Sequence, residues 1–472
     1  MNKLMRLSSL IGLLIIYATA CEPVREVTEP VSMILTWQQD PTTTMTIDWH
    51  TEPGDRALRT MEYRESGSSE WLQVESNRYD ELPFSDRVVN RVELTGLTPN
   101  TYYHFRVGEF TREYKFRTMP ENIDNQSITF AAGGDVRHEK EWMEQTNRRA
   151  MEYDPDFIYW GGDLAYDDGR EDRMYRLYEF LDAVMNTLIT EEGRVVPIIA
   201  TIGNHEGTGY THRIENFHHV NAIRKKHFAN YYALFAFPGL PGYNVLDFGK
   251  YMSLIILDSM HSNKPSYQGQ QEFLINTLAE RSDFPHIFPK YHVAGWASVK
   301  GFKYRDEQYE VRNYFHPYFE EHNLPVVFEN HDHAYKRTPP MRGNEVVEKG
   351  KGTVYIGDGN WGVGLREMVY HIPPEHIEKY DFDFDIPEDL SELQYNNTDI
   401  QWSETFNTFL ARERAVPEDY PYENTVDNIP YLDVFAAVRH VIITELQGEG
   451  ATFTVISDTG ELVDEYSYES RW

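Results

Sequence analysis

The feature of this sequence that most constrains its fold is a set of short apolar runs, each ending at a small residue. Four of them are Ile128 to Ala132, Phe157 to Trp160, Val195 to Ala200 and Pro325 to Phe328. A short apolar run bounded by glycine indicates a buried strand. A stretch from about Asp172 to Ile189, with apolar residues at spacings of three and four, indicates an intervening helix. Strands that alternate with helices predict a layered α/β fold.

Polar side chains follow each of these runs. The clusters are Gly133-Gly134-Asp135, Gly161 to Tyr166, Gly203-Asn204-His205-Glu206 and Asn330-His331-Asp332-His333. Carboxylate, imidazole and amide groups together suit first-row metal ions. A carboxylate can also bridge two ions about 3.5–4 Å apart, an arrangement that recurs in phosphoester hydrolases. One such cluster alone is often turn chemistry, but four in this order predict a shared metal site at strand ends.

The ordered clusters resemble the calcineurin-like metallophosphoesterases, whose pattern is D-x-[HG], G-D-x-x, G-N-H-[DE], a lone His and G-H-x-H. More narrowly, the chain resembles a purple acid phosphatase, because Tyr166 stands three residues after Asp163. This resemblance implies a four-layer sandwich of two sheets flanked by helices. It also implies Fe³⁺ with a second divalent ion, which is Zn²⁺, Mn²⁺ or Fe²⁺.

The resemblance assigns a role to each matching residue. It implies metal ligation by Asp135, Asp163, Tyr166, Asn204, His331 and His333. Asp163 would bridge the ions, and Tyr166 would bind iron through its phenolate. His205 would face the phosphate and stabilise the transferring group or protonate the leaving oxygen, as a near-neutral imidazole can.

Two positions depart from the family pattern. Trp296 stands where the lone ligand His is expected, and His292 lies about 13 Å back at ~3.3 Å per residue. Since indole has only a donor, we expect a weakened second metal site. Arg137 stands where Gly or His is usual. It could bind phosphate oxygens as a catalytic residue, or form a surface ion pair with Glu139 or another acid.

The chain before the catalytic region has a different pattern. Alternating apolar residues, such as Met45, Ile47 and Trp49, predict an all-β sandwich over residues 30–119. Its Leu94 to Tyr103 stretch resembles a fibronectin type III turn. The predicted catalytic domain covers residues 125–370, an acidic aromatic insertion covers 371–430, and closing strands at 431–472 complete a sheet. The insertion could cover the site mouth or form ordinary surface structure.

The first 21 residues indicate export. A charged start, an apolar run and Cys21, the single cysteine, predict a signal peptide of lipoprotein type. The alternative is an ordinary signal with a chance cysteine. A net charge of −32 argues against nucleic-acid partners. The expected partner is a small phosphorylated substrate, and membrane contact is expected only through a lipid on Cys21, in the periplasm or at the cell surface of a bacterium.

These features together predict an exported, metal-dependent phosphoesterase. The resemblance implies hydrolysis of phosphate monoesters by attack of metal-bound hydroxide. Two alternatives remain open at this point. One is an enzyme acting on phosphodiesters or nucleotides, and the other is a catalytically impaired surface binding protein on the same scaffold.

Overall fold

The computed structural model describes residues 29–51, 59–76, 78–108, 112–207, 220–299, 305–357, 359–366 and 431–471. The predicted signal segment with Cys21, residues 300–304 and the insertion 371–430 lie outside these residues. No helix in the described part is both long and apolar enough to cross a bilayer.

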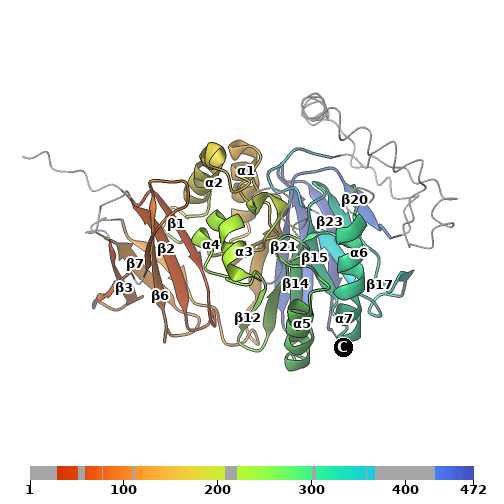
Figure 1. Cartoon of the computed structure of the whole chain (residues 1–472). Helices are drawn as coiled ribbons and strands as arrows, with labels where there is room; N and C mark the ends of the chain where they lie inside the picture. The colour runs from red at the N-terminus through yellow and green to blue at the C-terminus, as the bar shows by residue number, and fades with distance from the viewer. Residues whose placement is uncertain are drawn as a thin grey trace, which may run out of the picture.

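The N-terminal part is an all-β sandwich, at the left of Figure 1. One antiparallel sheet has the order β1 (Ser32–Thr36), β2 (Met45–Thr51), β6 (Val88–Leu94) and β5 (Arg78–Glu81). The other has the order β4 (Leu72–Glu75), β3 (Thr60–Glu65), β7 (Tyr102–Val107) and β8 (Tyr114–Arg117). The alternating residues Met45, Ile47 and Trp49 are all fully buried, which agrees with the predicted sandwich.

The first sheet of the catalytic part has six strands. Its order is β11 (Ile198–Ala200), β10 (Phe157–Trp160), β9 (Ile128–Gly133), β21 (His440–Gln447), β22 (Gly450–Ser457) and β23 (Leu462–Tyr468). Strands β9, β10 and β11 are parallel, and Trp160 pairs with both Gly133 and Ala200. These three strands therefore end at the same edge. The closing strands β21 to β23 add to this sheet by antiparallel pairing of β21 with β9.

The second sheet has seven strands, with β13, β14, β15 and β19 mutually parallel. Its order is β12 (Asn244–Phe248), β13 (Met252–Ile256), β14 (His286–Val293), β15 (Val326–Asn330), β19 (Val354–Gly357), β16 (Tyr335–Arg337) and β20 (Val434–Ala436). A separate two-stranded ribbon joins β17 (Met341–Arg342) to β18 (Glu345–Val346).

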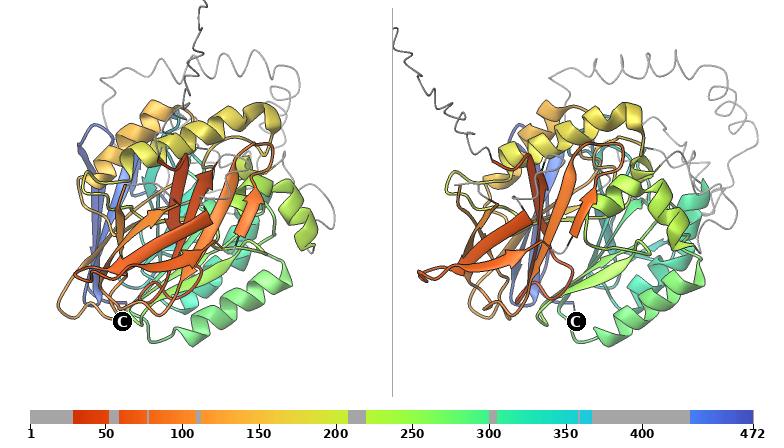
Figure 2. Two further views of the ribbon diagram at one scale, coloured as in Figure 1. Left: turned by 90° about the vertical axis from the view of Figure 1, so that its left-hand side faces the viewer. Right: turned by 60° about the vertical axis from the view of Figure 1, so that its left-hand side comes forward.

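Helices cover the outer face of each sheet, as Figures 1 and 2 show. Helices α1 (Lys140–Met151) and α2 (Met174–Thr187) pack on the first sheet. Helices α5 (Gln268–Glu280), α6 (Arg305–Tyr314) and α7 (His316–Glu321) lie on the second. The short α3 (Asn221–His227) and α4 (Ala229–Leu234) lie between the two domains. The predicted four-layer α/β sandwich preceded by an all-β domain is confirmed.

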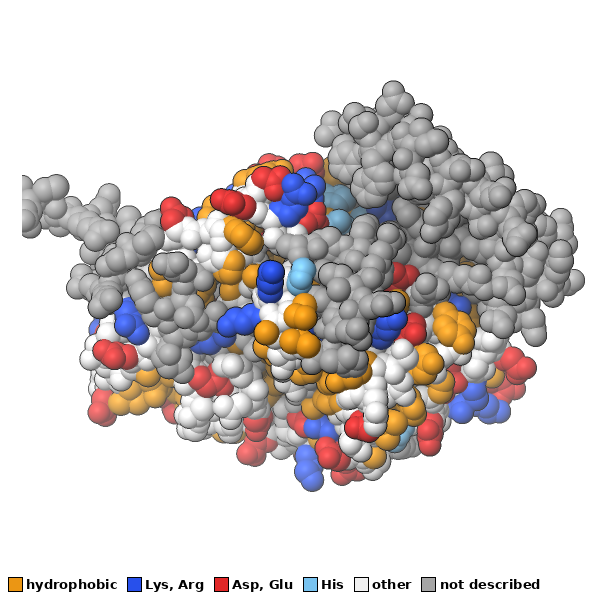
Figure 3. Space-filling model, viewed as in Figure 1, with side chains coloured by type: hydrophobic (Ala, Val, Ile, Leu, Met, Phe, Trp, Pro, Cys, Tyr) orange, Lys and Arg blue, Asp and Glu red, His pale blue; other side chains and the backbone are white. Residues whose placement is uncertain are grey.

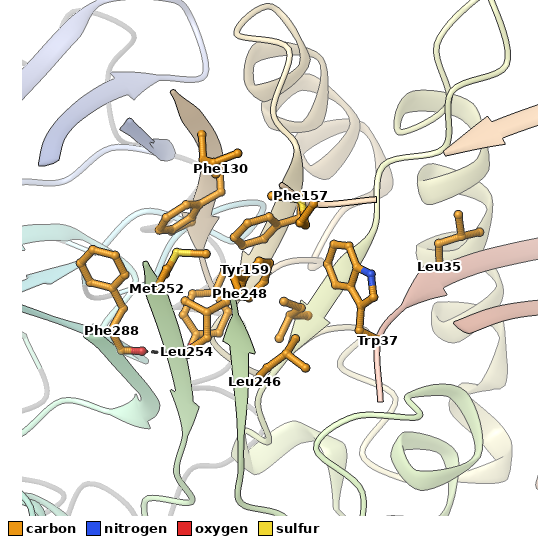
Figure 4. Packing of buried hydrophobic residues seen from close by; sticks show 14 of the residues in the cluster. Leu35, Trp37, Phe130, Phe157, Tyr159, Leu246, Phe248, Met252, Leu254 and Phe288 are labelled. Atoms are coloured by element: carbon orange, nitrogen blue, oxygen red, sulfur yellow. Dashed lines mark hydrogen bonds between the residues drawn. The ribbon is translucent and has the colours of Figure 1, made fainter. Parts of the chain in front are cut away.

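Aromatic side chains fill the space between the two sheets (Figure 4). Phe130 stacks on Phe157 with ring centroids 4.9 Å apart, and Phe130 lies 5.8 Å from Phe288 of the facing sheet. Trp37, which follows β1 of the N-terminal domain, packs edge-on against Phe157 and Phe248 at 6.0 and 5.7 Å. The core of the sandwich is therefore continuous with the N-terminal domain.

Substitution of Trp37 tests this shared core. We expect Trp37→Ala to lower the free energy of unfolding by roughly 3–5 kcal/mol, because it leaves a cavity between the domains. Urea unfolding followed by fluorescence and circular dichroism measures this change. The control Leu72→Ala, at a half-exposed position of β4, should change it by less than about 0.5 kcal/mol. Equal, small effects of both variants would contradict a shared core.

Candidate metal centre

Three loops from the first sheet bring acidic and amide side chains to one place. Asp135 follows β9, Asp163 follows β10 and Asn204 follows β11. Asp135 and Asp163 have φ values of 54° and 52°, in the left-handed region that Asp tolerates better than most residues. Both carboxylates are fully buried. Because the three strands end at the same level of the sheet, these residues lie close together although they are far apart in the sequence.

The second sheet supplies imidazoles to the same place. His331 and His333 follow β15, and His292 is the penultimate residue of β14. Ligand atoms of Asp135, Asp163, His292 and His331 all lie within 4.8 Å of one another. Residues from both sheets therefore converge on one centre, as the strand-end pattern predicts.

One half of the centre surrounds His292. Its Nε2 lies 3.1 Å from Asp163 Oδ2, 3.0 Å from His331 Nδ1 and 3.3 Å from Asn204 Oδ1. Its Nδ1 lies 2.8 Å from the carbonyl oxygen of Gly161, so Nδ1–H donates there and the Nε2 lone pair faces the centre. This orientation is characteristic of a metal-ligating histidine.

The other half of the centre surrounds Tyr166. Its hydroxyl donates to Asp135 Oδ1 at 3.1 Å and lies 3.2 Å from His333 Nε2. His333 Nε2 is itself 3.1 Å from Asp135 Oδ1, so the three ligand atoms form a triangle. Burial and the Asp135 carboxylate raise the pKa of the Tyr166 hydroxyl well above its usual value. A bound cation would be required to favour the phenolate.

The electrostatics of the centre favour positive charge. Burial opposes a charge on His292, but Asp163 and Asp135 outweigh burial and raise the pKa of His292 to about 9. Burial also opposes ionisation of Asp163, yet His292 and His205 lower its pKa below the usual range. Buried carboxylates, one amide oxygen and several imidazoles form a donor set that fits first-row metal ions.

The structure corrects the expectation for Trp296. Strand β14 ends at Val293, so the site edge is reached at His292 and the following residues turn away. Trp296 is buried instead in the helical layer, with its ring 5.3 Å from Tyr431 and 6.3 Å from His316. The structure therefore brings His292, and not Trp296, together with Asp135, Asp163 and His331.

His205 lies at the exposed rim of the centre. Its backbone N–H donates to Asp163 Oδ1 at 2.8 Å, and its Nε2 is 4.0 Å from Asp163 Oδ2. Its Nδ1 is 2.5 Å from Asp168 Oδ1, and Asp168 also forms an ion pair with Arg173. Asp168 thus fixes the orientation of the imidazole. The sequence reasoning missed Asp168, although it stands only two residues after Tyr166.

Glu206 is a second residue whose role was missed. Its Oε2 accepts the backbone N–H groups of Asp163 and Gly203 at 2.8 and 2.6 Å, and its Oε1 accepts that of Leu164 at 2.7 Å. One buried carboxylate thus joins the two loops that carry Asp163 and Asn204. The G-N-H-E motif contains the signal for this clamp, since Glu206 directly follows His205.

Arg137 forms an ion pair, as its second anticipated role required, but the pair is not at the surface. The residue is 4% exposed and pairs with Glu179 of α2. Burial and the neighbouring Arg176 lower the pKa of Arg137 to about 10. The partner is an acid of the helix that covers the first sheet, rather than Glu139, and no described contact joins Arg137 to the ligand group.

Comparison with known families agrees with this architecture. Residues 30–118 match the family described as the N-terminal domain of purple acid phosphatases. Residues 132–349 match the calcineurin-like phosphoesterase family. The two matches cover the β-sandwich and most of the two-sheet domain, including every residue of the ligand group.

Individual relatives and solved structures are distant. Probable purple acid phosphatase 20 from Arabidopsis thaliana is 25% identical over 61% of this chain and 64% of its own length. Purple acid phosphatase 21 from the same plant is 25% identical over 62% of each chain. The matched region thus spans just under two thirds of these relatives. A purple acid phosphatase from yellow lupin (Lupinus luteus) seeds covers 93% of this chain and 74% of its own, with a TM-score of 0.67 at 14% identity, which shows a shared fold.

Metal content tests the correction at His292. After loading and desalting, we expect about two ions per chain by mass spectrometry of the metals, as in two-metal phosphoesterases. His292→Ala should lower this toward one, because the second half loses an imidazole ligand. Trp296→Phe should leave the content unchanged. A wild-type content near one that is insensitive to His292→Ala would contradict the assignment.

Proposed function

The chain is a purple acid phosphatase-like member of the calcineurin-like phosphoesterases, and from this premise we propose that it hydrolyses phosphate monoesters at a dinuclear metal centre. The observation that carries the proposal is the convergence of Asp135, Asp163, His292 and His331 within 4.8 Å. These residues come from the ends of strands in two different sheets, so their meeting is a property of the whole fold.

The described side chains divide between two ions. Asp135, Tyr166 and His333 would hold the first, and Asn204, His292 and His331 the second, with Asp163 between them. A phenolate ligand favours Fe³⁺ at the first position, and the amide and imidazoles suit a divalent ion at the second. Such ions supply Lewis acidity, which polarises the phosphoryl group and makes water nucleophilic at moderate pH.

His205 is the protein group best placed to act on the substrate. Because Asp168 holds Nδ1, the other ring nitrogen, Nε2, is left facing the centre at its exposed rim. From there it can donate a hydrogen bond to a phosphoryl oxygen or transfer a proton to the leaving oxygen. Asp168 is a positioning residue in this scheme, and Arg173 holds Asp168 in turn.

The rival function of an impaired binding protein loses its main support. That reading depended on Trp296 as a replacement for a metal ligand, and the proximity of His292 to Asp163 and His331 supports a complete ligand set instead. Phosphodiesters and nucleotides remain an alternative substrate class, since one fold serves both chemistries. Rates on p-nitrophenyl phosphate, bis(p-nitrophenyl) phosphate and ATP separate the two classes. Export, with or without acylation of Cys21, remains a prediction from residues outside the described part.

Turnover is the direct test of the proposed function. We expect the metal-loaded protein to hydrolyse p-nitrophenyl phosphate and to lose this activity when a chelator removes the metal. His205→Ala should lower kcat by roughly 10²–10⁴-fold, the usual contribution of a general acid, while the metal content stays the same. A fully loaded wild-type protein that is inert on every phosphoester tested would overturn the proposal.

Asp168→Asn tests the positioning of His205. The amide keeps an acceptor oxygen but loses the charge that orients the imidazole, so we expect kcat to fall by about 10–100-fold with a smaller change in KM. Asp172→Asn is the matched control, because Asp172 is a nearby exposed acid paired with Arg170. If the two variants had the same kcat, Asp168 would have no role in catalysis.

A further inference from the structure

Beside the ligand group lies a histidine to which neither the motifs nor the proposed function gives a role. His138 follows Asp135 by three residues and is half-buried. Its ring lies 4.2 Å from the Tyr166 ring and 5.5 Å from the His333 ring, between centroids. His205 contacts the same Tyr166 ring at 4.3 Å. Two imidazoles therefore lie against the side chain that would hold the first ion.

The backbone around His138 is held in place by the loop after β19. Trp361 N–H donates to the Gly134 carbonyl at 3.0 Å, and Gly362 N–H donates to the Asp135 carbonyl at 3.1 Å. The His138 N–H donates to the Gly362 carbonyl at 2.9 Å. A Cβ at Gly362 would come within 2.1 Å of the Val136 carbonyl oxygen, so this close approach requires glycine. These hydrogen bonds fix the backbone that carries the imidazole.

The ring nitrogens of His138 take part in none of the contacts described so far. Within the described ranges, its ring makes contacts with other rings, and neither ring nitrogen has a hydrogen-bond partner. His138 is half-buried and its nitrogens are not among the buried polar atoms without a partner, so they can hydrogen-bond water or a ligand. The adjacent Arg137 turns to Glu179 instead. The imidazole therefore retains donor capacity next to the metal ligands.

Most of the charged groups that act on His138 are cations. His205, Arg366 and Arg176 act on it as cations and Asp163 acts as an anion, and Arg176 donates to the Tyr166 carbonyl at 3.1 Å. Figure 3 shows Lys or Arg and His side chains at the upper edge of the molecule, with Asp and Glu side chains among them. An anionic group would meet favourable charge here, although the chain as a whole is strongly acidic.

We propose that His138 binds the substrate phosphate, donating a ring N–H to a phosphoryl oxygen at the Tyr166 side of the centre. This inference rests on the proposed phosphoesterase function and adds a second imidazole, besides His205, that contacts the phosphate. An imidazole carries at least one N–H whether it is neutral or charged, so the contact does not require a particular protonation state.

The test compares binding of inorganic phosphate by metal-loaded variants. His138→Phe keeps a ring against Tyr166 and removes both ring nitrogens. It should weaken phosphate binding, measured by calorimetry and by competitive inhibition of p-nitrophenyl phosphate turnover, by about tenfold or more, as loss of one hydrogen bond to a charged group does. His138→Gln keeps a donor and should stay within about threefold of wild type.

The matched control is His322→Phe, at a half-buried histidine at the end of α7, which should bind phosphate as wild type does. Metal content and melting temperature are measured for every variant. If the phenyl ring disturbs folding, His138→Ala gives the same comparison. Wild-type phosphate affinity in His138→Phe would overturn the inference, as would loss of metal from every His138 variant. A wild-type protein that neither binds phosphate nor turns over would instead overturn the proposed function.

Discussion

The carboxylate of Asp163 is the point on which the candidate centre depends, because it joins the two sheets of the sandwich. Its Oδ1 accepts the His205 N–H from the first sheet, and its Oδ2 lies 3.1 Å from His292 of the second. Glu206 holds the backbone N–H of Asp163 itself. A buried carboxylate of this kind is stable only when positive charge and donors surround it. Because the buried Asp163 carboxylate needs positive charge around it, the same position is favourable for a bound cation.

The sequence predicted the layers of the fold and most of the ligand group, for one physical reason. Parallel strands end at a common edge, so the polar residue after each apolar run is delivered to the same place. Asp135, Asp163, Asn204 and His331 follow this rule and do converge. His292 was not among the predicted ligands, because the family's lone His was matched to Trp296, four residues later in the chain. Since the structure buries Trp296 in the helical layer, the match by position did not find the imidazole that reaches the centre.

Other contacts at the centre depend on the direction in which each side chain points, and a sequence does not give this direction. Arg137 and His138 are neighbours, yet one pairs with Glu179 of α2 and the other lies against Tyr166. Asp168 and Glu206 act through contacts with residues of another loop. Their residue types suit many roles, and the path of the backbone through each loop selects one of them.

The large negative net charge of the chain has little influence on the electrostatic potential at the centre. At physiological ionic strength, exposed charges are screened beyond about 8 Å. A phosphate at the centre therefore experiences mainly the nearby groups, which are the carboxylates of Asp135 and Asp163 on one side and Arg176, Arg366 and the imidazoles on the other. Arg176 is held by the loop that follows Asp163, because it donates to the Tyr166 carbonyl. Since metal ions would add further positive charge at short range, an acidic surface and an anionic substrate are compatible in one molecule.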